Sequence, residues 1–131
     1  MSNRKHAHHT VYNISYHLIW IPKYRKKILT EDVKLSLVEY LFEKAQQIDI
    51  IIDAYEIMPD HIHLFIKASP NILISFIVKS LKGYTSFKLR KKFKFLKSYK
   101  SLWTHSYYCE TIGLISESTV KKYISMQNHK K

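Results

Sequence analysis

The sequence lacks several features that define large classes of protein. Cys109 is its single cysteine, which excludes an internal disulfide and a zinc site made of cysteines. No apolar run approaches the roughly 18 residues that cross a bilayer, and the segment after Met1 has no signal-peptide hydrophobic stretch. Internal repeats and low-complexity linkers are also absent. We therefore expect one domain, soluble and cytoplasmic, with no membrane partner.

Acidic residues are scarce as well. The 10 Asp and Glu stand against 22 Lys and Arg, so the formal net charge is +12. In so small a domain this excess favours a polyanionic partner, either nucleic acid or an acidic membrane surface. No segment has the pattern of a basic amphipathic membrane helix, because the apolar faces look committed to a core. The charge therefore favours nucleic acid.

Hydrophobic periodicity predicts alternating strands and helices in one domain that covers residues 1–131. In chain order we expect a strand over 9–21, a helix capped by Thr30, strands over 49–58 and 61–68, a helix after Pro70 to about Phe93, a strand over Leu102–Cys109, a loop over Glu110–Ile115 and a helix capped by Ser116. Up to the loop, this is the order of a ferredoxin-like βαββαβ fold of the α+β class, an antiparallel sheet with helices on one face. The last helix, about 116–128, is an addition to that fold, and about 1–9 form an N-terminal arm.

The helix after Pro70 and the segment that follows it combine apolar, basic and aromatic residues. The expected apolar stripe consists of Ile74, Ile77, Val78 and Leu81, and the residues expected to face away are Lys79, Ser86 and Arg90. From Lys82 to Lys100 the chain is heavily basic with aromatics interleaved. Lys and Arg neutralise phosphates, and aromatic rings stack on unpaired bases. The alternative is a solvated helix face whose aromatics belong to the core.

The segment from Tyr55 to Ile66 carries the most informative pattern. Because side chains of a strand alternate between its faces, His61 and His63 leave one face with imidazoles close enough to share an ion. The apolar residues between and after them point the other way, toward a core. The alternative is two histidines that are solvated or hydrogen-bonded on a sheet face. Asp60 is either a carboxylate that orients an imidazole or a turn residue.

Tyr123 and Gln127 lie four residues apart on the final predicted helix and therefore share a face. The hydrophobic stripe of this helix thus ends in a neutral oxygen ligand one turn from a phenol. Taken alone, Tyr123 is most simply explained as an aromatic that faces the core.

Segments spread over roughly residues 11 to 128 resemble, in the same order, the single-tyrosine HUH transposases of the insertion-sequence 200/605 class, where HUH stands for His-hydrophobic-His. The segments are His17–Trp20 with the basic Lys23–Lys27, Met58–Phe65, Ser80–Tyr84, Trp103–Tyr107, and Thr119–Ile124 with Gln127. Each segment alone is weak evidence, but jointly they are specific.

The resemblance implies a metal-dependent DNA transposase. His61, His63 and Gln127 would bind Mg²⁺ or Mn²⁺, and no nucleotide cofactor is expected. Tyr123 would attack the scissile phosphorus of single-stranded DNA, keep the 5′-phosphate as a phosphotyrosine and release a 3′-hydroxyl. The family also implies a homodimer that binds DNA hairpins at element ends. In such a dimer the tyrosine helix of one subunit can serve the histidines of the other.

Basic residues near these segments are candidates for DNA contacts, which would associate the protein with the nucleoid. They are Lys23, Arg25, Lys26, Lys27, Lys79, Lys82, Arg90, Lys91 and Lys92. Two other interpretations stay open. One is a host-adapted, repeat-associated tyrosine transposase or nickase, and the other is a non-catalytic nucleic-acid-binding protein with a ferredoxin-like sheet. A pure binder would have no need of His61, His63, Tyr123 and Gln127 together, which argues against the second.

Overall fold

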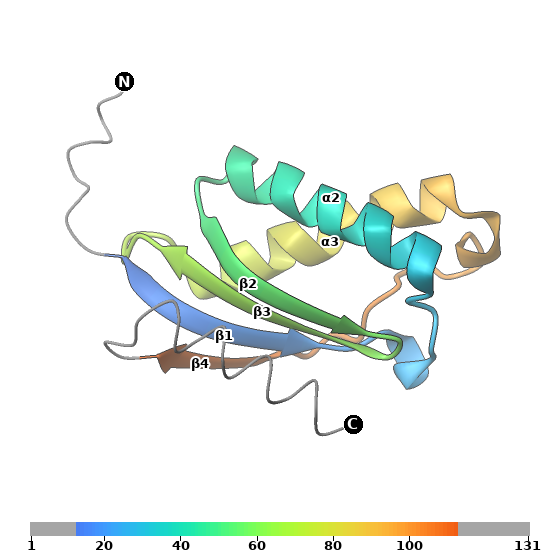
Figure 1. Cartoon of the computed structure of the whole chain (residues 1–131), viewed down its shortest axis with the longest axis horizontal. Helices are drawn as coiled ribbons and strands as arrows, with labels where there is room; N and C mark the ends of the chain where they lie inside the picture. Colours follow the sequence, from blue (N-terminus) through green and yellow to red (C-terminus); the bar gives the residue numbers. More distant parts are fainter. Residues whose placement is uncertain (1–12, 113–131) are drawn as a thin grey trace.

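The computed structural model describes residues 13–112, and in it two helices lie across one face of a four-stranded antiparallel sheet (Figure 1). The elements are strand β1 (Ile14–Trp20), 3-10 helix η1 (Lys23–Arg25), helix α2 (Glu31–Gln47), strands β2 (Ile51–Met58) and β3 (His61–Ala68), helix α3 (Ile74–Lys92), 3-10 helix η2 (Lys94–Leu96) and strand β4 (Tyr108–Ile112). The strand order β2-β3-β1-β4 confirms the predicted ferredoxin-like arrangement. The predicted N-terminal arm and final helix, with Tyr123 and Gln127, lie outside the described residues.

Local sequence signals account for the start of α2. Glu31 and Asp32 occupy its first turn, where negative charge interacts favourably with the helix dipole. Thr30 stands at the N-cap as expected, but its side chain makes no capping hydrogen bond. Its backbone carbonyl accepts a helical hydrogen bond from the Lys34 N–H at 2.7 Å. The helix boundary was therefore predicted correctly, whereas the expected capping contact does not form.

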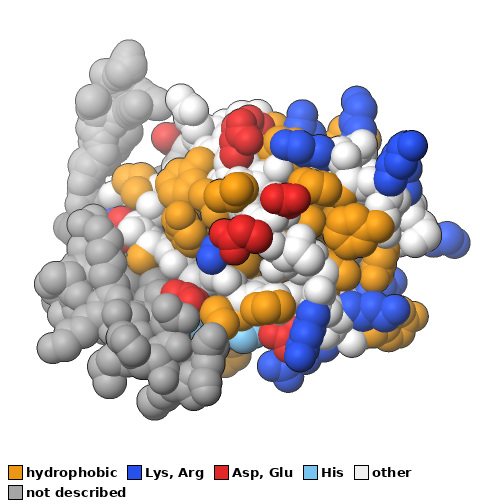
Figure 2. Space-filling model, turned by 45° about the vertical axis from the view of Figure 1, so that its right-hand side comes forward, with side chains coloured by type: hydrophobic (Ala, Val, Ile, Leu, Met, Phe, Trp, Pro, Cys, Tyr) orange, Lys and Arg blue, Asp and Glu red, His pale blue; other side chains and the backbone are white. Residues whose placement is uncertain are grey.

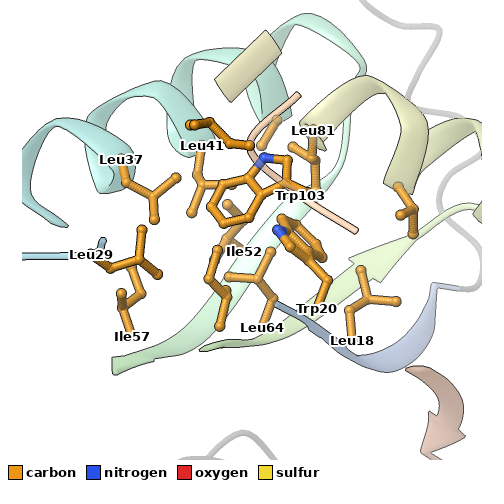
Figure 3. Packing of buried hydrophobic residues seen from close by; sticks show 14 of the residues in the cluster. Leu18, Trp20, Leu29, Leu37, Leu41, Ile52, Ile57, Leu64, Leu81 and Trp103 are labelled. Atoms are coloured by element: carbon orange, nitrogen blue, oxygen red, sulfur yellow. The ribbon is translucent and has the colours of Figure 1, made fainter. Parts of the chain in front are cut away.

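The core lies between the sheet and the two helices. In Figure 3, Trp20 and Leu64 of the sheet lie beneath Leu41 of α2 and Leu81 of α3, and all four are at most 1% exposed. Trp20 meets Trp103 edge to face, with ring centroids 6.0 Å apart and planes at 75°. Burial of a leucine such as Leu41, Leu64 or Leu81 contributes about 1.5–3 kcal/mol to the free energy of folding. This layer of side chains fixes how the helices sit on the sheet.

The fourth strand differs from its prediction. It begins at Tyr108 and runs to Ile112, so the prediction of a strand over Leu102–Cys109 and of a loop from Glu110 is wrong over most of its length. The cause is a contact from α3: the Lys82 ammonium donates to the carbonyls of Thr104, His105 and Ser106 at 2.6, 3.2 and 3.1 Å. These hydrogen bonds occupy carbonyls that a strand would use for its ladder.

Buried polar groups hold the segment before β4 against α3. Trp103 is 2% exposed and its Nε1 donates to Thr85 Oγ1 at 3.1 Å. Ser86 is 7% exposed and its Oγ accepts a hydrogen bond from the Leu102 backbone N–H at 3.1 Å. The prediction that Ser86 faces away from the core is therefore wrong, because its hydroxyl is needed to satisfy a buried backbone donor.

Candidate functional site: a histidine-bearing face of the sheet

Strand β3 separates apolar from polar side chains by simple alternation. Ile62, Leu64 and Ile66 are fully buried beneath the helices, whereas His61 and His63 are partly exposed on the other face. Their ring centroids lie 5.1 Å apart at 69°. This confirms the prediction that both histidines leave one face of the strand.

Cross-strand register brings a third histidine to the same face. In the β1–β3 pair Ile19 lies opposite His63 and His17 opposite Phe65, and in the β1–β4 pair Glu110 lies opposite His17. The His17 ring is 2% exposed and stacks on Phe65, with centroids 4.4 Å apart and planes at 4°. We call His17, His61, His63, Phe65 and Glu110 the histidine face.

Asp60 holds one ring nitrogen of His61. The distance between Asp60 Oδ1 and His61 Nδ1 is 2.8 Å, and Arg25 Nε donates to Asp60 Oδ2 at 3.1 Å. The His61 hydrogen bond first, and then the Arg25 charge, keep the pKa of Asp60 below its usual range. An ionised Asp60 accepts a hydrogen bond from His61 Nδ1–H, so Nε2 is the ring nitrogen that remains for another partner. The geometry matches the alternative in which Asp60 orients an imidazole.

His63 is held by His17 rather than by a carboxylate. The distance from His17 Nε2 to His63 Nδ1 is 3.1 Å, and His17 Nδ1 lies 3.4 Å from Glu110 Oε2. Burial, followed by the neighbouring His17 and His61, lowers the pKa of His63 to about 4. Burial also lowers the pKa of His17, an effect that Glu110 only partly opposes. Both rings are therefore neutral at pH 7, the form in which imidazole binds a metal.

The described residues include two of the three predicted metal ligands. His61 and His63 each have Nδ1 engaged, so Nε2 is the nitrogen that each offers, and neutral imidazole nitrogen is a common ligand of divalent metal ions. Within residues 13–112, no group of three or more His, Cys, Asp or Glu side chains is arranged to hold a metal. The third predicted ligand, Gln127, lies outside the described residues. The chain thus fits a divalent ion with two nitrogen donors from β3.

Neither His17 nor Glu110 was predicted from the sequence to have a functional role. A signal for His17 was present, because it alternates with Leu18 and Trp20 and so had to lie on the face opposite the core. Glu110 was assigned to a loop, so its place beside His17 could not be foreseen. Both omissions concern contacts between strands, which require the register of the sheet.

A basic groove of about 540 Å³ lies between α3 and the segment that precedes β4. Its basic lining residues are Lys23, Lys79, Lys82, Arg90 and Lys100. Its lining aromatics include Phe87, which is 58% exposed, and Tyr107, which is 37% exposed. Figure 2 shows Lys and Arg side chains gathered toward one side of the visible face. The groove joins cations to aromatic rings, the combination expected of a surface for single-stranded nucleic acid.

The structure separates the predicted DNA-contact residues into groups. Lys23, Lys79, Lys82 and Arg90 line the groove, while Lys26, Lys27 and Lys91 are exposed elsewhere. Three of the predicted residues also donate hydrogen bonds within the protein. Lys82 binds three carbonyls, Arg25 pairs with Asp60, and Lys92 Nζ donates to Ser36 Oγ at 2.8 Å.

Among residues 13–112, no helix is long and apolar enough to span a bilayer. This agrees with the absence of long apolar runs in the sequence.

Comparison with known proteins finds one family. The sequence pattern of the family described as "Transposase IS200 like" matches residues 10–127. The ISDra2 transposase TnpA of Deinococcus radiodurans is 35% identical over 123 residues, which cover 92% of this chain and 88% of that protein. The transposase for insertion sequence element IS200 of Salmonella typhimurium is 28% identical over 130 residues, which cover 97% of this chain and 85% of that protein.

Solved structures have the same fold. A crystal structure described as a transposase of Deinococcus radiodurans R1 superposes with a TM-score of 0.75 at 33% identity, over 97% of this chain and 98% of that one. A REP-associated tyrosine transposase bound to a REP hairpin superposes with a TM-score of 0.68 at 15% identity, over 99% of this chain and 74% of that one. The second likeness concerns the fold alone.

Proposed function

The chain belongs to the IS200-like transposase family, and we propose that it cleaves and rejoins single-stranded DNA at insertion-sequence ends through a 5′-phosphotyrosine. The observation that carries this proposal is the pair His61 and His63 on one face of β3. In each ring Nδ1 is held by a neighbour, which leaves both Nε2 atoms as donors. A core or surface role would not require two imidazoles to be oriented in this way.

The pair of Nε2 atoms would hold Mg²⁺ or Mn²⁺, with Gln127 as a third ligand. When bound, such an ion withdraws negative charge from a non-bridging oxygen of the scissile phosphate. Mg²⁺ prefers oxygen ligands, whereas Mn²⁺ accepts a mixed nitrogen and oxygen set more readily. No nucleotide cofactor enters the proposal.

Tyr123 would be the nucleophile. Its phenol has an ordinary pKa of about 10 and so must lose its proton as it attacks. The bond from Tyr123 Oη to phosphorus forms while the bond from phosphorus to the 3′-oxygen breaks, and the released 3′-hydroxyl takes up a proton. A later 3′-hydroxyl attacks the phosphotyrosine and reverses these steps. Because the phosphodiester energy is kept in the intermediate, joining needs no ATP.

The groove beside α3 would hold part of the bound DNA. Arg90 supports the assignment, because its Nε is buried and has no hydrogen-bond partner within the described residues. A phosphate oxygen would satisfy that donor, while Phe87 and Tyr107 can stack on unpaired bases. The REP hairpin bound to the structural neighbour supports a hairpin as the DNA form recognised by this chain as well.

The similarities favour mobility of an insertion sequence over the repeat-associated alternative. The chain is 35% and 28% identical to two insertion-sequence transposases but 15% identical to the REP-associated protein. The non-catalytic alternative has the difficulty that it leaves the oriented histidine pair without a use.

The proposal is tested with labelled single-stranded element ends, Mn²⁺ or Mg²⁺, and a denaturing gel. We expect a band of protein bound covalently to DNA that disappears when a chelator is added. Cleavage that persists in chelator would reject the metal, and the absence of any adduct across a set of hairpin substrates would reject the transposase chemistry.

We further propose a homodimer in which the helix with Tyr123 serves the histidines of the partner. Mixing a His61→Ala/His63→Ala subunit with a Tyr123→Phe subunit tests this arrangement. If the helix acts in trans, the heterodimer regains one complete site and cleaves DNA. If it acts in cis, both subunits are broken and no activity returns.

A further inference from the structure

His17 is a buried histidine that the proposed chemistry does not use directly. It lies on β1, an inner strand of the sheet, and its two ring nitrogens face His63 of β3 and Glu110 of β4. Its side chain is 2% exposed and its ring is stacked on Phe65. The ring is thus fixed on several sides, so its two nitrogens are presented in constant directions.

The hydrogen bonds of this group determine where each proton resides. Tyr108 Oη donates to Glu110 Oε1 at 2.8 Å, and His17 Nδ1 faces Glu110 Oε2 at 3.4 Å. The hydrogen bonds from Tyr108 and then from His17 keep the pKa of Glu110 below its usual range, so the carboxylate only accepts. His17 therefore carries its proton on Nδ1.

The tautomer of His17 determines that of His63. A neutral His17 protonated on Nδ1 has a lone pair on Nε2, which faces His63 Nδ1 at 3.1 Å. The contact between the two nitrogens is a hydrogen bond only if His63 Nδ1 carries the proton. His63 then has its own lone pair on Nε2.

We propose that His17 and Glu110 are positioning residues that hold His63 in its Nδ1-protonated tautomer and so present its Nε2 lone pair to a divalent cation. The inference rests on the proposed function for the identity of that cation, but not for the tautomer. It gives the two histidines of β3 different supports: Asp60 holds His61 directly, and Glu110 acts on His63 through His17. Partners of this kind fix the orientation of metal-binding histidines and tune their basicity.

The tautomer is measurable in the full chain without metal or DNA. Long-range proton–nitrogen NMR correlations at pH 7 distinguish a protonated ring nitrogen from an unprotonated one. We expect His63 to carry its proton on Nδ1, and the His17→Phe variant, which keeps an aromatic ring against Phe65 but removes the acceptor, to move it to Nε2. A wild-type His63 protonated on Nε2 would overturn the inference.

The consequence for metal binding is tested by titrating the chain with Mn²⁺ alone, followed by electron paramagnetic resonance. We expect the Mn²⁺ affinity of His17→Phe to fall about 10- to 100-fold. This is the usual loss when the hydrogen-bond partner of a metal-binding histidine is removed. His17→Gln can place a carbonyl oxygen near the former Nε2 atom and should lose less than the Phe variant. Unchanged affinity in His17→Phe, or no Mn²⁺ binding by the wild-type chain, would overturn the positioning role.

Two further comparisons separate this inference from folding and from the proposed function. Backbone NMR spectra of both variants show whether the sheet is intact, and His17→Gln serves if His17→Phe does not fold. If no covalent adduct forms but His63 carries its proton on Nδ1 as expected, the transposase chemistry alone is rejected. The opposite result, an adduct with the His63 proton on Nε2, would reject this inference alone.

Discussion

The two faces of the sheet are built from alternate residues of the same strands, yet they are organised differently. Beneath the helices, the side chains of Leu18, Ile62 and Leu64 are fully buried in one hydrophobic cluster. On the histidine face, His17, His61 and Glu110 each have a specific polar partner. The helix-covered face depends on volume and apolarity, whereas the histidine face depends on the direction of individual nitrogen and oxygen atoms.

This difference indicates where a substitution should cost stability and where it should cost chemistry. Neighbouring positions on β3 belong to opposite faces, so changes one residue apart along the strand should have unrelated effects.

Removing both imidazoles from β3 should have the largest effect on activity. The double variant His61→Ala/His63→Ala loses both proposed nitrogen ligands, and the ion they would hold is worth several kcal/mol in the transition state, about a thousandfold or more in rate. Cleavage of labelled single-stranded DNA should vanish, while hairpin affinity and thermal stability stay near those of the wild type. A double variant that cleaves normally in chelator would contradict the metal assignment.

Shortening a side chain on the helix-covered face should affect stability instead. Leu64 is fully buried, so Leu64→Ala should lower the free energy of unfolding by about 2–5 kcal/mol, measured by urea denaturation. Glu56 of β2 is paired with His63 and so lies on the same face as the histidines, not beneath the helices. It provides the matched control. Glu56→Ala should cost about 0.5 kcal/mol or less. Equal costs for the two variants would mean that the faces are not as distinct as described.

A smaller effect is expected in the groove, which lies apart from both proposed histidine ligands. Lys79→Gln removes one cation that lines it and should weaken hairpin binding, with the slope of log affinity against log salt reduced by about 1. Lys97 is exposed but does not line the groove, so Lys97→Gln should change the slope less. If both variants change the slope equally, DNA binding depends on the net charge of the protein and not on the groove.

Local patterns were sufficient to predict the elements that depend on neighbouring residues. Alternation from His61 to Ile66 predicted both the hairpin strand and its two faces, and acidic residues after Thr30 predicted the start of α2. These signals operate within a few residues, so a single sequence contains them in full.

Contacts between distant segments explain what could not be predicted. The ammonium of Lys82 takes the carbonyls of 104–106 and delays the start of β4, although the sequence there resembles a strand. The place of Glu110 beside His17 depends on that shifted strand. The sequence predicted the pair of His61 and His63. The contacts of His17 with His63 and Glu110 could not be predicted, because they depend on the register of three strands. The assignments of Tyr123 and Gln127 stay predictions, because both lie outside the described residues.

The central claim is that Tyr123 forms the covalent bond with DNA at the histidine face. The most direct measurement is mass spectrometry of the protein trapped on a single-stranded element end in the presence of Mn²⁺. The DNA should be attached to the peptide that contains Tyr123, and Tyr123→Phe should abolish the adduct while leaving folding and hairpin affinity nearly unchanged. An adduct on any other tyrosine, or an undiminished adduct in Tyr123→Phe, would contradict the claim.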